Sequence, residues 1–478
     1  MTWAAGFAAL ALVAGLGPAS AMEPLGPAAA PPVAPVARAG ASGIGDDYFP
    51  LDGNGGIDVQ RYEIHDTYRF RSRRLSGWTR LTITATEPLT SFNLDLLLPV
   101  MGVTVDGDTA AHERPDPHEL TITPVQPLAT GRTVEVVVRY VGRPGDIAWE
   151  GESNWVASST EVIAVNQPHM ATWWFPANDH PRDKALMDIS ISVPRGKVVV
   201  AGGQRVGREV TGAFATTRWL SAEPMAPYLA FFAAGPFEVE HGTHRGLPWV
   251  TAVSRAVPDR DFRRSQRLMR HSARLTSWLE TQLGPYPFGS TGGVTTSLTT
   301  PFALENQTRP VYPVLAPGSG PVVVHELAHQ WFGDSVSVES WHDIWLNEGA
   351  ATFMEVRYGE TRGRIDGTRW LQQQYDEHHG DADFWQVRLD DPGAERLFDH
   401  AVYARGAMLF QALRQIMGEA GFWRLLRRWV DEHAGSNAST EDFEAMAEQV
   451  SGRDLDDFFA AWLRGTTRPA RTSANGLV

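Results

Sequence analysis

The segment His325-Glu326-Leu327-Ala328-His329 constrains this chain more than any other feature. On a helix, residues four positions apart lie on the same face, so both imidazoles can reach one metal ion. Glu326 follows the first histidine, where its carboxylate can address a metal-held water without being a ligand. The same pattern also arises by chance on buried helices. Taken alone, it indicates a zinc-binding helix and leaves a purely structural helix open.

A second helical segment offers the third ligand that catalytic zinc usually requires. Glu348 lies in Trp345-Leu346-Asn347-Glu348-Gly349, nineteen residues after His329. Its apolar neighbours are a poor setting for a solvated carboxylate. The chain contains no cysteine, so any metal must be held by His, Asp or Glu. We therefore expect one zinc ion per chain, bound by His325, His329 and Glu348.

Residue patterning divides the 478-residue chain into two folded regions. Between Tyr48 and about Pro236, short alternating segments such as 134–138 and 189–193 are separated by turn residues, which predicts an all-β region. After about residue 238 the pattern is mostly helical, with helices expected over 259–283, 321–332, 343–357, 402–417, 420–433, 440–450 and 454–464. A β-like piece is expected over 292–312.

These patterns predict an α+β multidomain protein. An all-β domain (46–237) precedes a mostly helical domain (238–468) that carries the zinc-binding motif. Residues 22–45 are rich in Pro, Ala and Gly and are predicted to be a flexible linker, and residues 469–478 a frayed tail.

The amino terminus predicts export from the cell. An apolar run over Ala4–Leu16 precedes Ala19-Ser20-Ala21, the small-x-small pattern of a cleavage site, so residues 1–21 read as a signal peptide. No Arg or Lys precedes the run, because the first basic residue is Arg38. The signal is therefore atypical, or the true start codon lies upstream. An Ala-rich leader without this role is the alternative.

Charge and missing motifs exclude several classes of function. Lys and Arg number 42 against 56 Asp and Glu, a formal charge of -14, which disfavours nucleic acid and anionic lipid as partners. No later stretch is long and apolar enough for a membrane helix. The sequence has no Gly-x-Ser-x-Gly elbow and no phosphate-binding glycine loop. We expect a monomer.

Further segments carry a resemblance to a known family. The His-Glu-x-x-His, eighteen residues, Glu arrangement resembles the gluzincin aminopeptidases of the aminopeptidase N and leukotriene hydrolase group. Phe302-Ala303-Leu304-Glu305-Asn306 is similar to that family's Gly-Ala-Met-Glu-Asn motif, and residues 402–407 resemble its Tyr-x-Lys-Gly segment. Residues 174–185 look like the end of the family's β domain. The resemblance covers about 48–468 and implies a β sandwich or saddle domain followed by a thermolysin-like, mostly helical catalytic domain.

The resemblance implies a role for each matching residue. Glu326 would be the general base and Tyr403 would donate a hydrogen bond to the developing oxyanion. Glu305 would bind the substrate's free α-ammonium group with help from Gln167, and its motif neighbours Ala303 and Asn306 would also contact substrate. Without the resemblance, Tyr403 would be read as a half-buried core tyrosine, Glu305 as an ordinary strand-edge acid and Gln167 as an isolated polar residue.

Two departures from the family pattern leave other activities open. Phe302 replaces the first glycine of the motif, and the sequence ends soon after residue 466, without the family's long helical domain. The sequence thus resembles the short, secreted bacterial form, with a more open cleft. We predict an aminopeptidase that removes the N-terminal residue from peptides. The alternatives are an endopeptidase with an open cleft and a non-catalytic peptide-binding protein.

Overall fold

The computed structural model describes residues 36–477. The predicted signal peptide and most of the predicted linker lie outside the described residues, so both stay predictions. The linker prediction is wrong for residues 38–45. There, β1 (Arg38–Ala39) pairs with β4 (Leu89–Asp95), and the Gly40 amide donates to the Ser91 carbonyl at 2.8 Å. Backbone pairing with a strand edge needs no large apolar side chain, so the composition of this segment did not reveal it.

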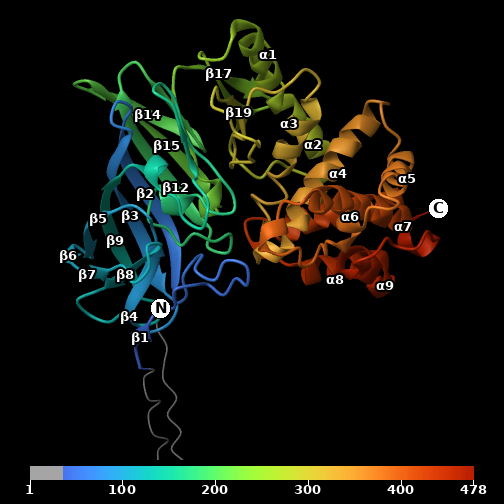
Figure 1. The fold of residues 1–478 in the computed structure, drawn as a ribbon, viewed down its shortest axis with the longest axis horizontal. Helices are drawn as coiled ribbons and strands as arrows, with labels where there is room; N and C mark the ends of the chain where they lie inside the picture. Colours follow the sequence, from blue (N-terminus) through green and yellow to red (C-terminus); the bar gives the residue numbers. More distant parts are fainter. Residues whose placement is uncertain (1–35, 478) are drawn as a thin grey trace, which may run out of the picture. The chain divides into compact units, whose positions relative to one another are not determined.

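An eight-stranded sheet forms the centre of the β region, in the order β14-β15-β12-β2-β3-β9-β5-β6 (Figure 1). Its strands alternate between buried and exposed residues. In β9, for example, Val134, Val136 and Val138 are buried, whereas Glu135 and Arg139 are exposed. The strands are β2 (Ile57–Arg69), β3 (Arg74–Ala85), β5 (Val100–Val105), β6 (Asp108–Thr109), β9 (Thr133–Gly142), β12 (Ala185–Pro194), β14 (Gln204–Thr211) and β15 (Phe214–Met225).

Two four-stranded sheets complete the β region, in the orders β1-β4-β8-β7 and β10-β11-β16-β13. The expectation of a β-rich domain ahead of a helical catalytic region is confirmed. The remaining strands of these sheets are β7 (Ala111–Glu113), β8 (Glu119–Thr123), β10 (Trp155–Ala157), β11 (Val162–Ala164), β13 (Val198–Ala201) and β16 (Phe232–Gly235).

The catalytic region opens with strands where mostly helical structure was expected. Residues 237–254 form the hairpin β17 (Phe237–His244) and β18 (Leu247–Ser254), joined through Arg245 and Gly246, which both have positive φ. This two-residue turn is the kind that antiparallel hairpins favour. The strand order of this sheet is β17-β18-β19-β20. The expected β piece over 292–312 coincides, to within one residue, with β19 (Thr291–Thr295) and β20 (Val311–Tyr312). A short parallel pair joins β21 (Ser337–Val338) to β22 (Asn437–Ala438).

Helices make up most of the rest of the chain (Figure 1). The two helices expected over 402–417 and 420–433 form one element, α7, interrupted at Gly418, where φ is 70°. The helices are α1 (Asp259–Arg270), α2 (Ser272–Leu283), α3 (Gly320–Ala328), α4 (Trp345–Thr361), α5 (Gly367–Glu377), α6 (Ala382–Gln386), α7 (His400–Glu432), α8 (Thr440–Ser451) and α9 (Asp456–Phe459).

The predicted frayed tail is wrong for residues 469–477. The Tyr375 hydroxyl donates to the Pro469 carbonyl at 2.6 Å, and the Trp462 indole donates to the Asn475 carbonyl at 3.2 Å. Leu477 is buried. This segment is held by contacts with residues far away in the sequence, which its local composition cannot reveal.

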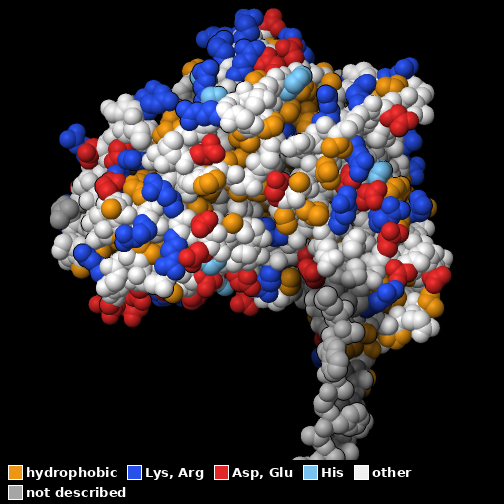
Figure 2. All heavy atoms as spheres, turned by 180° about the vertical axis from the view of Figure 1, so that it is seen from behind, with side chains coloured by type: hydrophobic (Ala, Val, Ile, Leu, Met, Phe, Trp, Pro, Cys, Tyr) orange, Lys and Arg blue, Asp and Glu red, His pale blue; other side chains and the backbone are white. Residues whose placement is uncertain are grey.

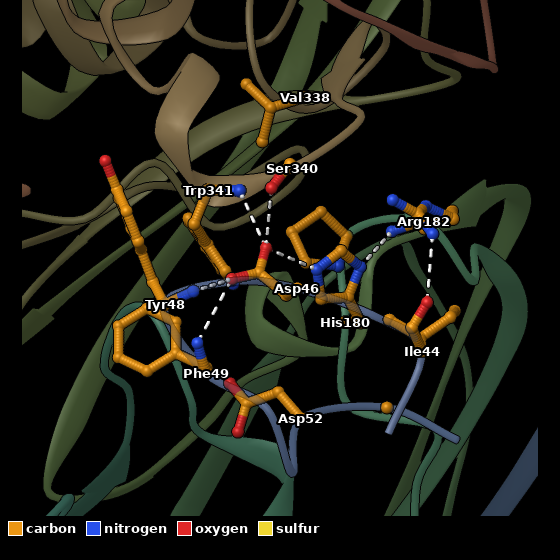
Figure 3. A network of polar contacts seen from close by, with 12 residues as sticks. Ile44, Asp46, Tyr48, Phe49, Asp52, His180, Arg182, Val338, Ser340 and Trp341 are labelled. Atoms are coloured by element: carbon orange, nitrogen blue, oxygen red, sulfur yellow. Dashed lines mark hydrogen bonds and ion pairs between the residues drawn. The ribbon is translucent and has the colours of Figure 1, made fainter. Parts of the chain in front are cut away.

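The segment before β2 joins the β region to the catalytic region through Asp46 (Figure 3). One carboxylate oxygen accepts hydrogen bonds from the Ser340 hydroxyl at 2.8 Å and the Trp341 amide at 3.0 Å, and lies 3.1 Å from Nε2 of His180. The other oxygen accepts from the Tyr48 amide at 2.9 Å. A single buried carboxylate thus ties three segments together.

The surface carries both signs of charge despite the net negative balance. Figure 2 shows acidic and basic side chains interspersed over one face, with basic side chains gathered at its top, where α1 lies in Figure 1. Among the described residues, no helix combines the length and apolarity needed to cross a membrane.

Candidate metal centre and active site

Helix α3 carries His325 and Glu326, and His329 follows directly with helical backbone angles. Pro321 lies in the first turn, a position where its missing N–H group costs nothing, and Gly333, with φ 121°, follows the helix. Four residues apart, the two imidazoles lie on one face, with ring centres 4.8 Å apart. The helix therefore presents two ligands and the candidate base together.

Helix α4 supplies the third ligand. Oε2 of Glu348 lies 3.2 Å from Nε2 of His325 and 3.3 Å from Nε2 of His329. The three side chains are buried, and their donor atoms all lie within 4.8 Å of one another. Ligand atoms about 2.1 Å from a tetrahedral zinc ion lie about 3.4 Å apart, so these spacings fit zinc. Two imidazoles and one carboxylate are also the donors of a catalytic zinc site that keeps one position open.

The second nitrogen of each imidazole has a partner of its own. Nδ1 of His325 lies 2.9 Å from Oε1 of Glu355, and Nδ1 of His329 lies 3.0 Å from the Phe332 carbonyl oxygen. Both partners accept hydrogen bonds, so each Nδ1 carries the proton and each Nε2 is left free to bind a metal. The rings are thus held in the tautomer that zinc binding needs.

Burial and neighbouring charges give two glutamates of the site different pKa values. Burial alone would raise the pKa of Glu348, but His329 and His325 lower this pKa to about 2. Burial raises the pKa of Glu326 to about 8, although both histidines oppose the shift. Glu348 is therefore the permanent anion expected of a ligand. Glu326 has the stronger affinity for a proton that a general base requires.

Glu305, Glu326 and His329 form a second group whose donor atoms lie within 4.8 Å of one another. His329 belongs to both groups, so the two sets describe one continuous cluster. His325 and Glu348 complete the zinc ligands, which leaves Glu305 and Glu326 as uncommitted carboxylates beside the metal position. A site with two such groups can hold a base and a cationic substrate group at once.

Tyr403 lies in the first turns of α7, and its ring stacks on His325 with centroids 5.9 Å apart. Burial, and then the charges of Glu348, Glu305 and Glu326, raise its pKa well above the usual value. The hydroxyl therefore stays protonated in neutral and mildly alkaline solution. It is available as a hydrogen-bond donor beside the metal position.

Glu305 is 2% exposed and is held by its backbone and its side chain. Its neighbour Leu304 pairs with Val311, which places the segment along β20. The Gln330 amide donates to the Glu305 carbonyl at 2.7 Å, and the Tyr228 hydroxyl donates to the Glu305 carboxylate at 3.3 Å. These contacts aim a buried carboxylate into the site.

A cavity of about 300 Å³ contains the whole arrangement. Gln167 and Ala303 line it, as the resemblance implies, and no described residue accepts a hydrogen bond from the buried Gln167 side-chain nitrogen. Asn306 does not line the cavity; its amide donates to the Leu229 carbonyl at 3.1 Å. The lining residues are Asn166, Gln167, Phe302, Ala303, Leu304, Glu305, His325, Glu326, His329, Glu348, Phe398 and Tyr403.

Sequence reasoning did not find four residues that shape this site. Glu355 follows Glu348 by seven residues, two helical turns, so helical spacing was a signal for it. Gln330 directly follows the zinc motif and is fully buried. Its place next to the motif was the signal that could have identified it. Tyr228 and Phe398 come from distant segments, and no local pattern connects them to the metal.

Comparison with known proteins supports the family resemblance. The profile of the peptidase family M1 domain matches residues 319–462, which carry the metal ligands and Tyr403. A solved two-domain M1 zinc metallopeptidase, a glutamate-to-alanine mutant bound to L-arginine, superposes with a TM-score of 0.82 at 27% identity. It covers 90% of this chain, and this chain covers 99% of it. Residues 319–462 thus match a peptidase family M1 domain, and the chain shares its fold with two-domain M1 zinc metallopeptidases.

Other M1 proteins support the same relationship. An M1 zinc metallopeptidase mutant from Deinococcus radiodurans bound to Tyr-Ser-Ala superposes with a TM-score of 0.79 at 26% identity, covering 90% of this chain and 100% of that one. Aminopeptidase N of Streptomyces lividans is 31% identical over 175 residues, 33% of this chain and 20% of that protein. Aminopeptidase M1-D of Oryza sativa subsp. japonica is 26% identical over 315 residues, 61% of this chain. The match spans only 35% of that rice protein's length.

Proposed function

We propose that this protein is a zinc-dependent aminopeptidase that hydrolyses the N-terminal residue from peptides. The observation that carries the proposal is the position of Glu305. Its buried carboxylate lines the same cavity as the zinc ligands and is not needed to bind the metal. A free α-ammonium group held there would place the first peptide bond of a substrate over the metal. An endopeptidase has no need of such an anchor.

The remaining side chains account for the reaction. Zinc, when bound, supplies a Lewis acid that polarises the scissile carbonyl and acidifies a water molecule. Glu326 accepts the proton of the attacking water and returns it to the departing amine, which its raised pKa favours. Tyr403 donates a hydrogen bond to the carbonyl oxygen as negative charge develops on it. Gln167 offers an amide group to the substrate backbone near the terminus.

The test compares two fluorogenic amides of one amino acid, with a free and with an acetylated amine. Arg, Tyr and Trp are suitable residues, because structural relatives bind L-arginine, Tyr-Ser-Ala and L-tryptophan. We expect chelator-sensitive cleavage of the free amine only. Glu305→Gln should raise KM at least tenfold. Glu395→Gln, at an exposed glutamate, is the matched control.

The other outcomes would change the assignment. Equal cleavage of both compounds would overturn terminus capture and indicate an endopeptidase. Absence of cleavage from zinc-loaded protein, across all residues tried, would indicate a non-catalytic peptide-binding protein.

A further inference from the structure

A second cluster of metal-binding side chains lies in the β region. Asp95 ends β4, Glu119 begins β8 directly opposite it, and His118 precedes Glu119. Their relative exposures are 0%, 1% and 0% in that order, and their donor atoms all lie within 4.8 Å of one another. None of these residues belongs to the proposed aminopeptidase site.

The spacing of these atoms fits a shared cation better than a shared proton. Nδ1 of His118 lies 3.5 Å from Oε1 of Glu119 and 3.8 Å from Oδ1 of Asp95. Both separations exceed hydrogen-bonding distance. By contrast, Nδ1 of His169 in the same region makes a direct contact of 2.6 Å with Asp52. Separations of about 3.4 Å are expected between ligands of one tetrahedral ion.

Four of these buried atoms lack a protein partner. Over residues 36–477, neither ring nitrogen of His118 and neither carboxylate oxygen of Glu119 makes a hydrogen bond. Buried polar atoms are nearly always paired, so two whole side chains without partners indicate a missing ligand. The ring of His118 stacks on Trp149, with centroids 4.2 Å apart and planes 11° apart, which fixes the orientation of its nitrogen edge.

The excess of buried carboxylates around this cluster also favours a bound cation. Two more buried carboxylates lie close by, because the Asp179 amide donates to Asp95 at 2.6 Å and the Gly53 amide, next to Asp52, donates to Asp95 at 3.1 Å. One oxygen of Asp52 and one of Asp179 also lack a hydrogen-bond partner among the described residues. Asp52, Asp95, Glu119 and Asp179 lie near the imidazoles of His118 and His169, so the buried carboxylates outnumber the histidines in this part of the described chain.

We propose that Asp95, His118 and Glu119 bind a divalent cation that stabilises the β region. One imidazole with two carboxylates favours zinc over magnesium or calcium, which prefer oxygen ligands alone. The cation joins β4 to the start of β8. Through Asp95 it also holds the backbone at Gly53 and Asp179. Its role is structural, because no residue of this cluster lines the cavity of the zinc centre.

The experiment measures metal per chain by mass spectrometry after gel filtration in metal-free buffer. The full chain should retain two equivalents. The double variant His325→Ala and His329→Ala, which removes the catalytic ligands, should retain one. Glu119→Gln should also retain one and keep its peptidase activity. Glu113→Gln, at an exposed glutamate on the neighbouring strand β7, should retain two.

Each alternative result decides the proposal. One equivalent in the wild type and none in the double variant would overturn it, whether or not Glu119→Gln folds. Loss of the second equivalent in Asp454→Asn but not in Glu119→Gln would place the ion in the surface group Glu448, Asp454 and Asp456 and overturn it too. If the double variant retained calcium or manganese, the choice of zinc would be overturned, but the assignment of a cation site to Asp95, His118 and Glu119 would stand.

A stability measurement supplies an independent readout. Chelation of the double variant should lower its melting temperature by several degrees, and added Zn²⁺ should restore the temperature, since a ligand that binds only the folded state stabilises it. The triple variant that adds Glu119→Gln should show no response. An equal response in the triple variant would contradict binding at this cluster.

Discussion

Nδ1 of His325 lies 2.9 Å from Oε1 of Glu355, so helix α4 both completes the metal site and orients one of its ligands. Glu348 and Glu355 are seven residues apart, two turns of α4, and therefore lie on one face. The first belongs to the candidate metal set, and the second fixes the tautomer of the histidine beside it.

Removing this orienting contact should weaken zinc binding. We expect Glu355→Ala to lower zinc affinity by about 10- to 100-fold, as for other partners of metal-binding histidines. Activity should return when zinc is in excess. The measurement is a zinc titration in a competing chelator, with Glu395→Gln as the exposed control. Unchanged affinity together with a lower kcat would mean that Glu355 acts on the reaction and not on the metal.

Replacing the proposed base should lower turnover strongly without loss of the metal. Glu326→Gln keeps the size of the side chain but cannot accept the proton of water, so kcat should fall by about 10²- to 10⁴-fold. Zinc content should stay at the wild-type value. Because Glu326 also forms a potential ligand set with Glu305 and His329, loss of zinc in this variant would show that the metal lies in that set instead.

The hydroxyl of Tyr403 should affect kcat more than KM. Tyr403→Phe removes a donor to the developing oxyanion, and one such donor contributes about 10²- to 10³-fold to kcat. Because the pKa of Tyr403 lies well above its usual value, wild-type kcat should show no loss from tyrosine ionisation up to about pH 10. A variant with raised KM and unchanged kcat would assign Tyr403 to substrate binding.

The close approach of His325, His329 and Glu348 could be predicted from the sequence because a helix converts spacing directly into geometry. The four-residue spacing of His325 and His329 was enough to place both side chains on one helix face. The apolar setting of Glu348 on the next helix was enough to indicate a buried carboxylate. Family resemblance, not spacing, suggested Glu305 and Tyr403. The role of Tyr228 could not be predicted from the sequence, because its contact with Glu305 joins residues 77 positions apart.

The same limit explains the errors in the fold. Residues 38–45 and 469–477 are poor in large apolar side chains, and both are held by hydrogen bonds to distant segments. Asp46 shows this well, since its partners Ser340 and Trp341 follow almost 300 residues later. Local composition predicts how much a segment can bury, but not which polar partners a folded protein provides.

Asp46 should therefore contribute to stability in a pH-dependent way. Burial alone would raise its pKa, but His180 and the hydrogen bonds from Trp341 and Ser340 hold this pKa well below its usual value. A folded-state pKa below the unfolded one stabilises the protein above about pH 4, and the effect is lost as pH falls. Asp46→Asn should cost about 3 kcal/mol at pH 7.

Unfolding of wild type and Asp46→Asn should be compared at pH 7, 5 and 3. The difference in unfolding free energy should be largest at pH 7 and 5 and shrink towards pH 3. Asp47→Asn, at the exposed neighbouring aspartate, is the control and should leave stability within about 0.5 kcal/mol of wild type. A difference between wild type and Asp46→Asn that does not depend on pH would mean that the contribution is steric.

Close packing of α4 on α7 should link stability to catalysis. A Cβ atom at Gly406 would lie 2.8 Å from Cα of Gly349, a backbone contact too short to accommodate. Gly349 adjoins the ligand Glu348, and Gly406 lies one turn after Tyr403, so separating the helices moves both groups. We expect Gly406→Ala to cost about 1 to 3 kcal/mol and to lower kcat at saturating zinc.

Gly421→Ala, in the same helix, meets only Met417 at 3.4 Å and should retain wild-type kcat and stability. A destabilised Gly406→Ala protein with wild-type kcat would show that the site tolerates movement of α7, and that Tyr403 is not positioned by this contact.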